Sequence, residues 1–201
     1  DIPASASIKK LPPMIAARST STRETLTDRV PQTRIYKIWN IPQYGTAAAD
    51  ELSMFGLVLG GSGSSRLDKR LVLGDKIADN VSAGADISEL GGNFLITADV
   101  KEGVDPGKVE AAIQEELDKL LKEGPSADEL SQASTVVRAG FIRGIERIGG
   151  FGGKAGLVLG RLRAGVVEVL LVALAVERAR RFQQAERFAR KAARVWTSSR
   201  S

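Results

Sequence analysis

Two side chains in the sequence have the types and the spacing for nucleophilic chemistry, Ser65 and Lys69. Residues one helical turn apart lie on one face of a helix, and a lysine whose pKa is lowered by burial can accept the proton of a serine hydroxyl. Such a pair would hydrolyse small esters or amides without histidine. The structural alternative is a serine that caps a helix, followed by a surface lysine. Nothing nearby in the sequence predicts burial of Lys69.

Composition excludes most other catalytic classes. The 201 residues contain no histidine and no cysteine. Histidine is the usual proton shuttle near neutral pH and the commonest metal ligand, so a Ser-His-Asp triad, an H-E-x-x-H zinc site and thiol chemistry are impossible on this chain alone. The carboxylate pairs Asp50-Glu51 and Glu115-Glu116 are neighbours in sequence, so on a helix they should point apart into solvent. We therefore expect neither a metal nor a cofactor.

Two glycine-rich stretches could instead bind phosphate. The first, LGGSGSSRLDKR at 59–70, lacks the lysine of a Walker loop and is predicted to follow a helix rather than a strand. The second contains Gly150, Gly152 and Ala155 in the dinucleotide-binding spacing. It also follows a helical pattern, and it lacks the acidic residue expected about 20 positions later in a second strand. Both stretches are interpreted as glycine corners or breaks in a helix.

Positive charge is concentrated at the C-terminal end. Residues 178–201 hold eight basic side chains and one acidic side chain, a net charge of +7 within a total of +5. A basic helix there could bind nucleic acid or an anionic membrane. Its candidate contacts are Arg180, Arg181, Arg187, Arg190, Lys191 and Arg194. The alternative is the polar outer face of a packed helix. The longest apolar run, 164–176, is too short to cross a bilayer.

The N-terminal half of the chain shows alternating strand and helix signals. Residues 1–32 contain four of the seven prolines and then alternate polar and apolar side chains, which predicts a linker followed by an edge strand. The β-branched and aromatic stretch 33–42 predicts a strand. A helix should begin after Thr46 and end at Gly60, Gly61 and Gly63, which can adopt left-handed backbone geometry. Ser64 or Ser65 should cap a short second helix.

The following residues predict a hairpin and two helices. Residues 80–103 fit two strands joined around Gly91-Gly92. Asp105 followed by proline should begin a helix with a buried stripe, and Gly124 should end it. A capping box, Ser126 with Glu129, should begin the next helix.

These elements predict an α+β fold, a mixed or antiparallel sheet with helices packed on one face. We expect the two consecutive helices after residue 105 to cover that face. Three regions are predicted: a linker and edge strand at 1–32, an α+β domain at 33–155 and a helical, basic extension at 156–201. From residue 156 the composition becomes rich in Arg, Ala, Val and Leu, as a change of reading frame in GC-rich DNA would produce.

The order of these elements, with the segments 30–72, 88–133 and 141–155 and the motif LGGSGSSRL, resembles the pitrilysin/insulinase-type zinc peptidases, a group that includes mitochondrial processing peptidase. The resemblance covers roughly residues 1–155 and implies a mitochondrial processing peptidase-like module, the one that follows the module with the inverted zinc motif H-x-x-E-H. No zinc ligand carries over. The resemblance thus implies a non-catalytic domain that supports a peptide-binding chamber.

The same resemblance suggests partners and a compartment. It implies association with a zinc-bearing peptidase module, or self-association, and contact with a peptide substrate only within such an assembly. It also suggests the bacterial periplasm or cell envelope.

Overall fold

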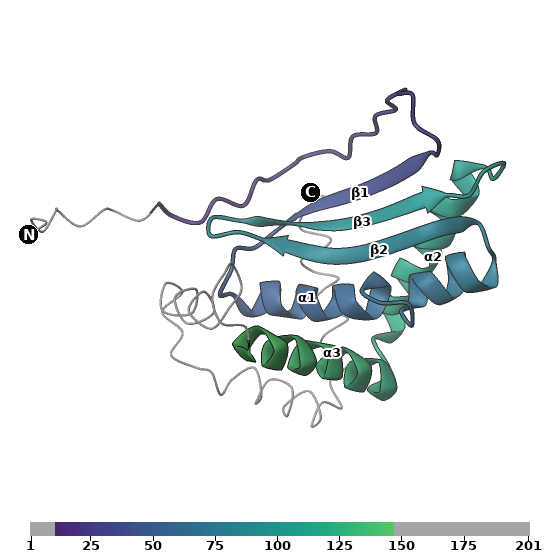
Figure 1. Cartoon of the computed structure of the whole chain (residues 1–201). Helices are drawn as coiled ribbons and strands as arrows, with labels where there is room; N and C mark the ends of the chain where they lie inside the picture. The colour runs from purple at the N-terminus through teal and green to yellow at the C-terminus, as the bar shows by residue number, and fades with distance from the viewer. Residues whose placement is uncertain (1–10, 147–201) are drawn as a thin grey trace, which may run out of the picture.

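The computed structural model describes residues 11–146, which form a three-stranded sheet and a set of helices on one side of it (Figure 1). The elements in chain order are β1 (Arg34–Ile41), α1 (Ala47–Gly60), the short helix η1 (Asp68–Gly74), β2 (Ala78–Ile87), β3 (Gly92–Val100), α2 (Pro106–Glu123) and α3 (Ala127–Glu146). None of the helices in this part of the chain is long and apolar enough to span a membrane.

Local sequence signals place most helix ends as predicted. The Thr46 hydroxyl accepts a hydrogen bond from the Ala49 amide at 3.3 Å, and the Asp105 carboxylate accepts one from the Gly107 amide at 3.0 Å. Each side chain thereby satisfies one of the amides that have no partner in a first helical turn. Gly124 has a φ of 77° and ends α2, because a residue with a side chain is strained in that conformation.

The predicted capping box at the start of α3 is confirmed. The Glu129 amide donates to Ser126 Oγ at 3.2 Å, and the Ser126 amide donates to Glu129 Oε2 at 2.7 Å. This reciprocal pair fixes the turn between α2 and α3.

The sheet is antiparallel, with strand order β1-β3-β2. β1 pairs with β3 from Arg34 opposite Asp99 to Ile41 opposite Gly92, and β2 pairs with the other side of β3. Both β1 and β2 are therefore edge strands of the described sheet. The predicted α+β class with helices on one face is confirmed.

The helix layer differs from the prediction. α1 packs on β2. α2 lies beside α1, and Lys37 Nζ of β1 donates a hydrogen bond to Gln114 Oε1 of α2 at 2.9 Å. α3 packs on α1 in an outer layer, so α2 and α3 together do not cover the sheet. The reason lies in the side chains: among the apolar residues of α3 whose burial the structure describes, only Ala133 is buried. The largest fully buried side chains are Leu59, Leu67, Leu71, Phe94, Ile96, Val109, Ile113, Leu117 and Leu120.

The predicted edge strand near the N-terminus is absent, because residues 11–32 form no strand. Leu26 is 88% exposed and Val30 is 59% exposed, so the alternating pattern there has no apolar surface to pack against. The short second helix is present, and its residues Asp68–Gly74 have the wider π-helical hydrogen bonding that the sequence did not predict.

Candidate functional site: the glycine corner and the open sheet face

The glycines at the end of α1 provide space rather than left-handed geometry. Gly61 caps the helix with a φ of −86°, so the predicted left-handed cap is wrong. A Cβ on Gly60 would lie 2.5 Å from the Ala83 amide nitrogen, and one on Gly56 would lie 2.9 Å from Gly84 Cα. These two glycines, one turn apart, let α1 lie directly against the backbone of β2.

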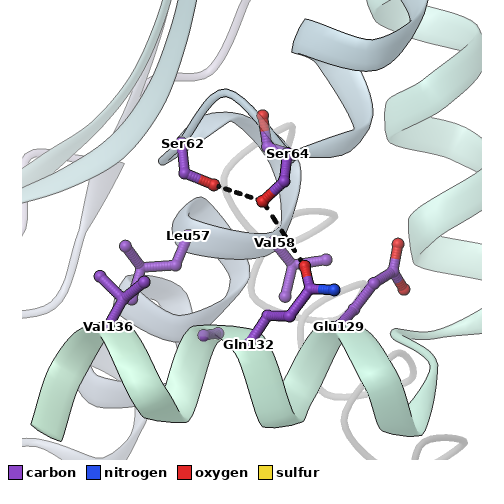
Figure 2. Close-up of a pocket in the computed structure, with 9 residues that line it drawn as sticks. Leu57, Val58, Ser62, Ser64, Glu129, Gln132 and Val136 are labelled. Carbon is purple, nitrogen blue, oxygen red and sulfur yellow. Dashed lines mark hydrogen bonds between the residues drawn. The ribbon is translucent and has the colours of Figure 1, made fainter.

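This glycine corner does not form a phosphate site. It follows the C-terminal end of α1, where the helix dipole places partial negative charge. Ser62 Oγ and Ser64 Oγ are 3.1 Å apart, and Ser64 Oγ donates to Gln132 Oε1 on α3 at 3.5 Å (Figure 2). The hollow between the corner and α3 holds about 30 Å³, the space of about one water molecule. The stretch is therefore a corner between helices, as the sequence predicts.

The structure does not form the Ser65–Lys69 pair. Ser65 is 4% exposed, and its hydroxyl has no hydrogen-bond partner within residues 11–146. Lys69 is exposed, and its backbone amide donates to the Ser65 carbonyl at 3.0 Å. The predicted serine cap is not formed either, because Ser64 bonds to Ser62 and Gln132 while the Ser65 hydroxyl is unpaired.

An ion pair joins the corner to the turn between α2 and α3. Arg66 donates to both carboxylate oxygens of Glu129, at 2.7 and 2.9 Å, and also to the Gly124 carbonyl at 3.1 Å. The Arg66 hydrogen bonds, helped by the Ser126 amide, lower the pKa of Glu129 to about 2. Glu129 thus serves the capping box and the ion pair together. Sequence reasoning identified Glu129 only as a cap, because Arg66 lies 63 residues away.

A second cluster corrects the prediction for the acidic pair in α2. Arg70 on η1 donates to Glu115 at 2.7 Å, to Glu116 at 3.1 Å and to Asp75 at 3.0 Å. Glu116 is only 9% exposed, so the two neighbouring glutamates converge on one guanidinium instead of both facing solvent. Hydrogen bonds to these three carboxylates raise the pKa of Arg70. The cluster fixes η1 to α2.

The face of the sheet opposite the helices is open within the described residues (Figure 1). Tyr36 is 57% exposed and Ile38 is 59% exposed, whereas Ile35 and Trp39, the alternate residues of β1, pack against the core. Across the same face, Ser82 Oγ and Thr97 Oγ1 are 2.7 Å apart. Arg34 pairs with Asp99 and lowers the pKa of that carboxyl. This open face therefore carries apolar and hydroxyl side chains, the Arg34–Asp99 ion pair and the exposed carboxylate of Asp86.

Comparison with known proteins identifies the family. A family model described as the peptidase M16 inactive domain matches residues 1–136. The chain belongs to this family. The match ends within α3, before the composition changes, and it confirms the resemblance to pitrilysin-type peptidases. No curated protein sequence matches the chain.

Several solved peptidase structures share this fold. A protease from Helicobacter pylori aligns with a TM-score of 0.70 and 19% identity, over 87% of this chain and 41% of that one. An inactive peptidase domain of a zinc protease from Bordetella parapertussis aligns with a TM-score of 0.62 and 19% identity, over 83% of this chain and 88% of that one. Pitrilysin aligns with a TM-score of 0.57 and 15% identity, over 85% of this chain and 18% of that one. The chain thus spans about two fifths of the length of the H. pylori protease.

The residues of this M16 inactive domain do not fit a zinc ion. An H-x-x-E-H zinc motif needs two imidazoles, and this chain has no histidine in its 201 residues. Within residues 11–146 no group of three acidic side chains is placed to hold a metal. The glycine pattern of Gly150, Gly152 and Ala155 and the basic residues from Arg180 to Arg194 lie outside the described residues.

Proposed function

We propose that this chain is a non-catalytic M16 module that associates with a zinc-bearing peptidase module and lines a shared peptide cavity with its open sheet face. One observation supports this role most directly: the open face carries two large side chains, Tyr36 and Ile38, each more than half exposed. Exposed apolar residues that gather on one face are typical of binding surfaces.

The chemistry of the open face suits peptides of varied sequence. Tyr36 and Ile38 offer apolar contact, and the Ser82–Thr97 hydroxyl pair offers hydrogen bonds that do not depend on charge. The Arg34 guanidinium is matched by Asp99, which leaves the exposed Asp86 carboxylate to favour a basic side chain at its end of the face. A cavity wall of this kind holds an extended chain while the chemistry takes place on the other module.

The test combines the full chain with a separately purified M16 module that carries H-x-x-E-H. Complex formation is measured by light scattering during size-exclusion chromatography, and kcat/KM is measured with a fluorogenic peptide. We expect the chain to raise kcat/KM, and we expect Ile38→Asp to remove about 90% of that gain because it places a charge on the apolar face. Leu73→Asp is the matched control, since Leu73 is 60% exposed but lies on η1, away from the open face.

The result that would overturn the proposal is an unchanged kcat/KM on addition of the chain, or equal losses for Ile38→Asp and Leu73→Asp. Circular dichroism of both variants checks that each has folded. Self-association is the second partner mode that the family resemblance suggests, and chromatography of the chain alone measures it. No observation in the structure favours ester or amide hydrolysis, because Ser65 is buried and its hydroxyl is not bonded to Lys69.

A further inference from the structure

β1 combines two properties that rarely occur together on an unprotected edge strand. It lies at the edge of the sheet, and its eight residues, RIYKIWNI, are mostly β-branched and aromatic. Long apolar edge strands pair readily with other strands, and natural proteins cover or interrupt them. β2, the opposite edge, is irregular at Ala78 and Asn80, where its register shifts. β1 has no such interruption in its pairing with β3.

A segment from the N-terminal region runs along β1 (Figure 1). At one end of the strand the Met14 amide donates to the Leu90 carbonyl at 2.7 Å, and Asn40 Nδ2 donates to the Ala16 carbonyl at 2.6 Å. Near the middle, Arg23 contacts Glu110 at 2.8 Å, and Glu110 also lies 4.0 Å from Lys37 of β1. The segment therefore follows the strand although it forms no strand itself.

This segment is held by polar contacts with almost no apolar burial. Met14, Leu26 and Val30 are 66%, 88% and 59% exposed. The Arg23–Glu110 pair is itself exposed, with 77% of the arginine side chain accessible, and exposed pairs contribute little to stability. A covering held in this way is displaced at low cost.

We propose that residues 14–32 form a strap that covers the free edge of β1, and that release of this strap lets β1 pair with β1 of a second copy of the chain. The second copy fits because β1 is self-complementary when it pairs antiparallel about Ile38. In that register Lys37 lies opposite Trp39 and Tyr36 lies opposite Asn40, so no like charges meet. Such a contact is two-fold symmetric and closes after two chains.

The absence of cysteine from the chain makes a direct test available. Ile38→Cys places a single thiol at the centre of the proposed contact, where directly opposite Cβ atoms of paired strands lie about 5 Å apart and a short thiol-reactive cross-linker can join them. Met14→Pro with Arg23→Ala releases the strap at two of its contacts, the backbone bond to Leu90 and the ion pair with Glu110, and neither substitution lies in a strand. The measurement is the fraction of covalent dimer after brief treatment of the full-length chain with a short bismaleimide.

We expect the cross-linked fraction of Ile38→Cys to rise about tenfold when the strap is released. The strap competes with the second copy for the edge of β1, and as part of the same chain it competes at a high effective concentration. Arg18→Ala with Arg29→Ala is the matched control and should leave the fraction unchanged, since neither side chain contacts the sheet. Leu73→Cys in the released background measures cross-linking by random collision.

Equal cross-linking of Ile38→Cys with the strap held or released would overturn the proposal, as would a released-strap value no higher than that of Leu73→Cys. Glu110→Gln breaks the same ion pair from α2 without a substitution in the strap, and it also removes the carboxylate beside Lys37. It should raise the dimer fraction in the same direction even if the proline variant folds poorly.

Discussion

Replacing Gly60 by alanine should destabilise the fold, although the same change in most helices stabilises it. In an open helical position the change gains up to about 1 kcal/mol, because glycine loses more backbone entropy than alanine on folding. At Gly60 the added Cβ would lie 2.5 Å from the Ala83 nitrogen, 2.8 Å from Ala83 Cβ and 3.0 Å from the Ser82 carbonyl carbon. Two of these three atoms belong to the β2 backbone, which cannot rotate away.

The change in the free energy of unfolding for Gly60→Ala is the difference between the cost of the steric clash and the gain in helix propensity. Forcing an extra methyl group into a packed interface costs about 1–3 kcal/mol, and a 2.5 Å approach to backbone belongs at the upper end of that range. The net loss for Gly60→Ala should therefore be about 1–2 kcal/mol. Gly140→Ala is the matched control: Gly140 lies within α3, is exposed and has no neighbouring atom within 4 Å of the added Cβ.

Urea unfolding followed by circular dichroism measures both variants, with the midpoint read at an unchanged m-value. Gly60→Ala should lower the midpoint, and Gly140→Ala should raise it slightly. If both variants shift the midpoint upward, α1 does not lie against the β2 backbone as closely as described here. The explanation of the glycine corner as a space requirement would then be wrong.

Two further predictions concern the corner. Because the pKa of Glu129 is lowered from 4.5 to about 2, its ionised form stabilises the fold above pH 4.5, and this contribution disappears as the pH falls through about 2. The stability difference between wild type and Glu129→Gln should therefore shrink between these two pH values, and a constant difference would contradict the pairing with Arg66. Ser65→Ala should leave stability unchanged or raise it by up to about 1 kcal/mol, since it removes a buried hydroxyl without a partner. A loss of stability of more than about 1 kcal/mol, measured by urea unfolding, would show that the Ser65 hydroxyl forms a hydrogen bond.

Signals carried by neighbouring residues predicted the framework of the fold well. Thr46, Asp105 and the Ser126–Glu129 box each act on amides within three residues, so the helix starts can be identified from sequence alone. The same holds for the end of α2, where Gly124 adopts the positive φ that favours glycine. The strand at 34–41 and the hairpin around Gly91 follow from residue type and alternation.

Features that depend on distant residues could not be predicted in this way. The sequence predicts a left-handed cap at Gly60, whereas the reason for glycine there is the position of Ala83 on β2. The sequence also predicts that Glu116 faces solvent, because its partner Arg70 lies 46 residues away. The alternation at residues 25–30 is typical of a strand, but Leu26 and Val30 are exposed and have no apolar surface to pack on.

The open sheet face and the covered edge both follow from the position of α1. Because Gly56 and Gly60 bring α1 against β2, the helices gather on one side, and α3 is left to pack on α1 instead of crossing to the other face. Ile38 of β1 then belongs to two surfaces at once, the open face through its side chain and the free edge through its backbone. Ile38→Asp therefore acts on both proposed contacts, because residue 38 lies opposite its own copy in the proposed dimer, whereas Arg23→Ala acts only on access to the edge. A partner module that covers the face without touching the edge should bind equally well with the strap held or released.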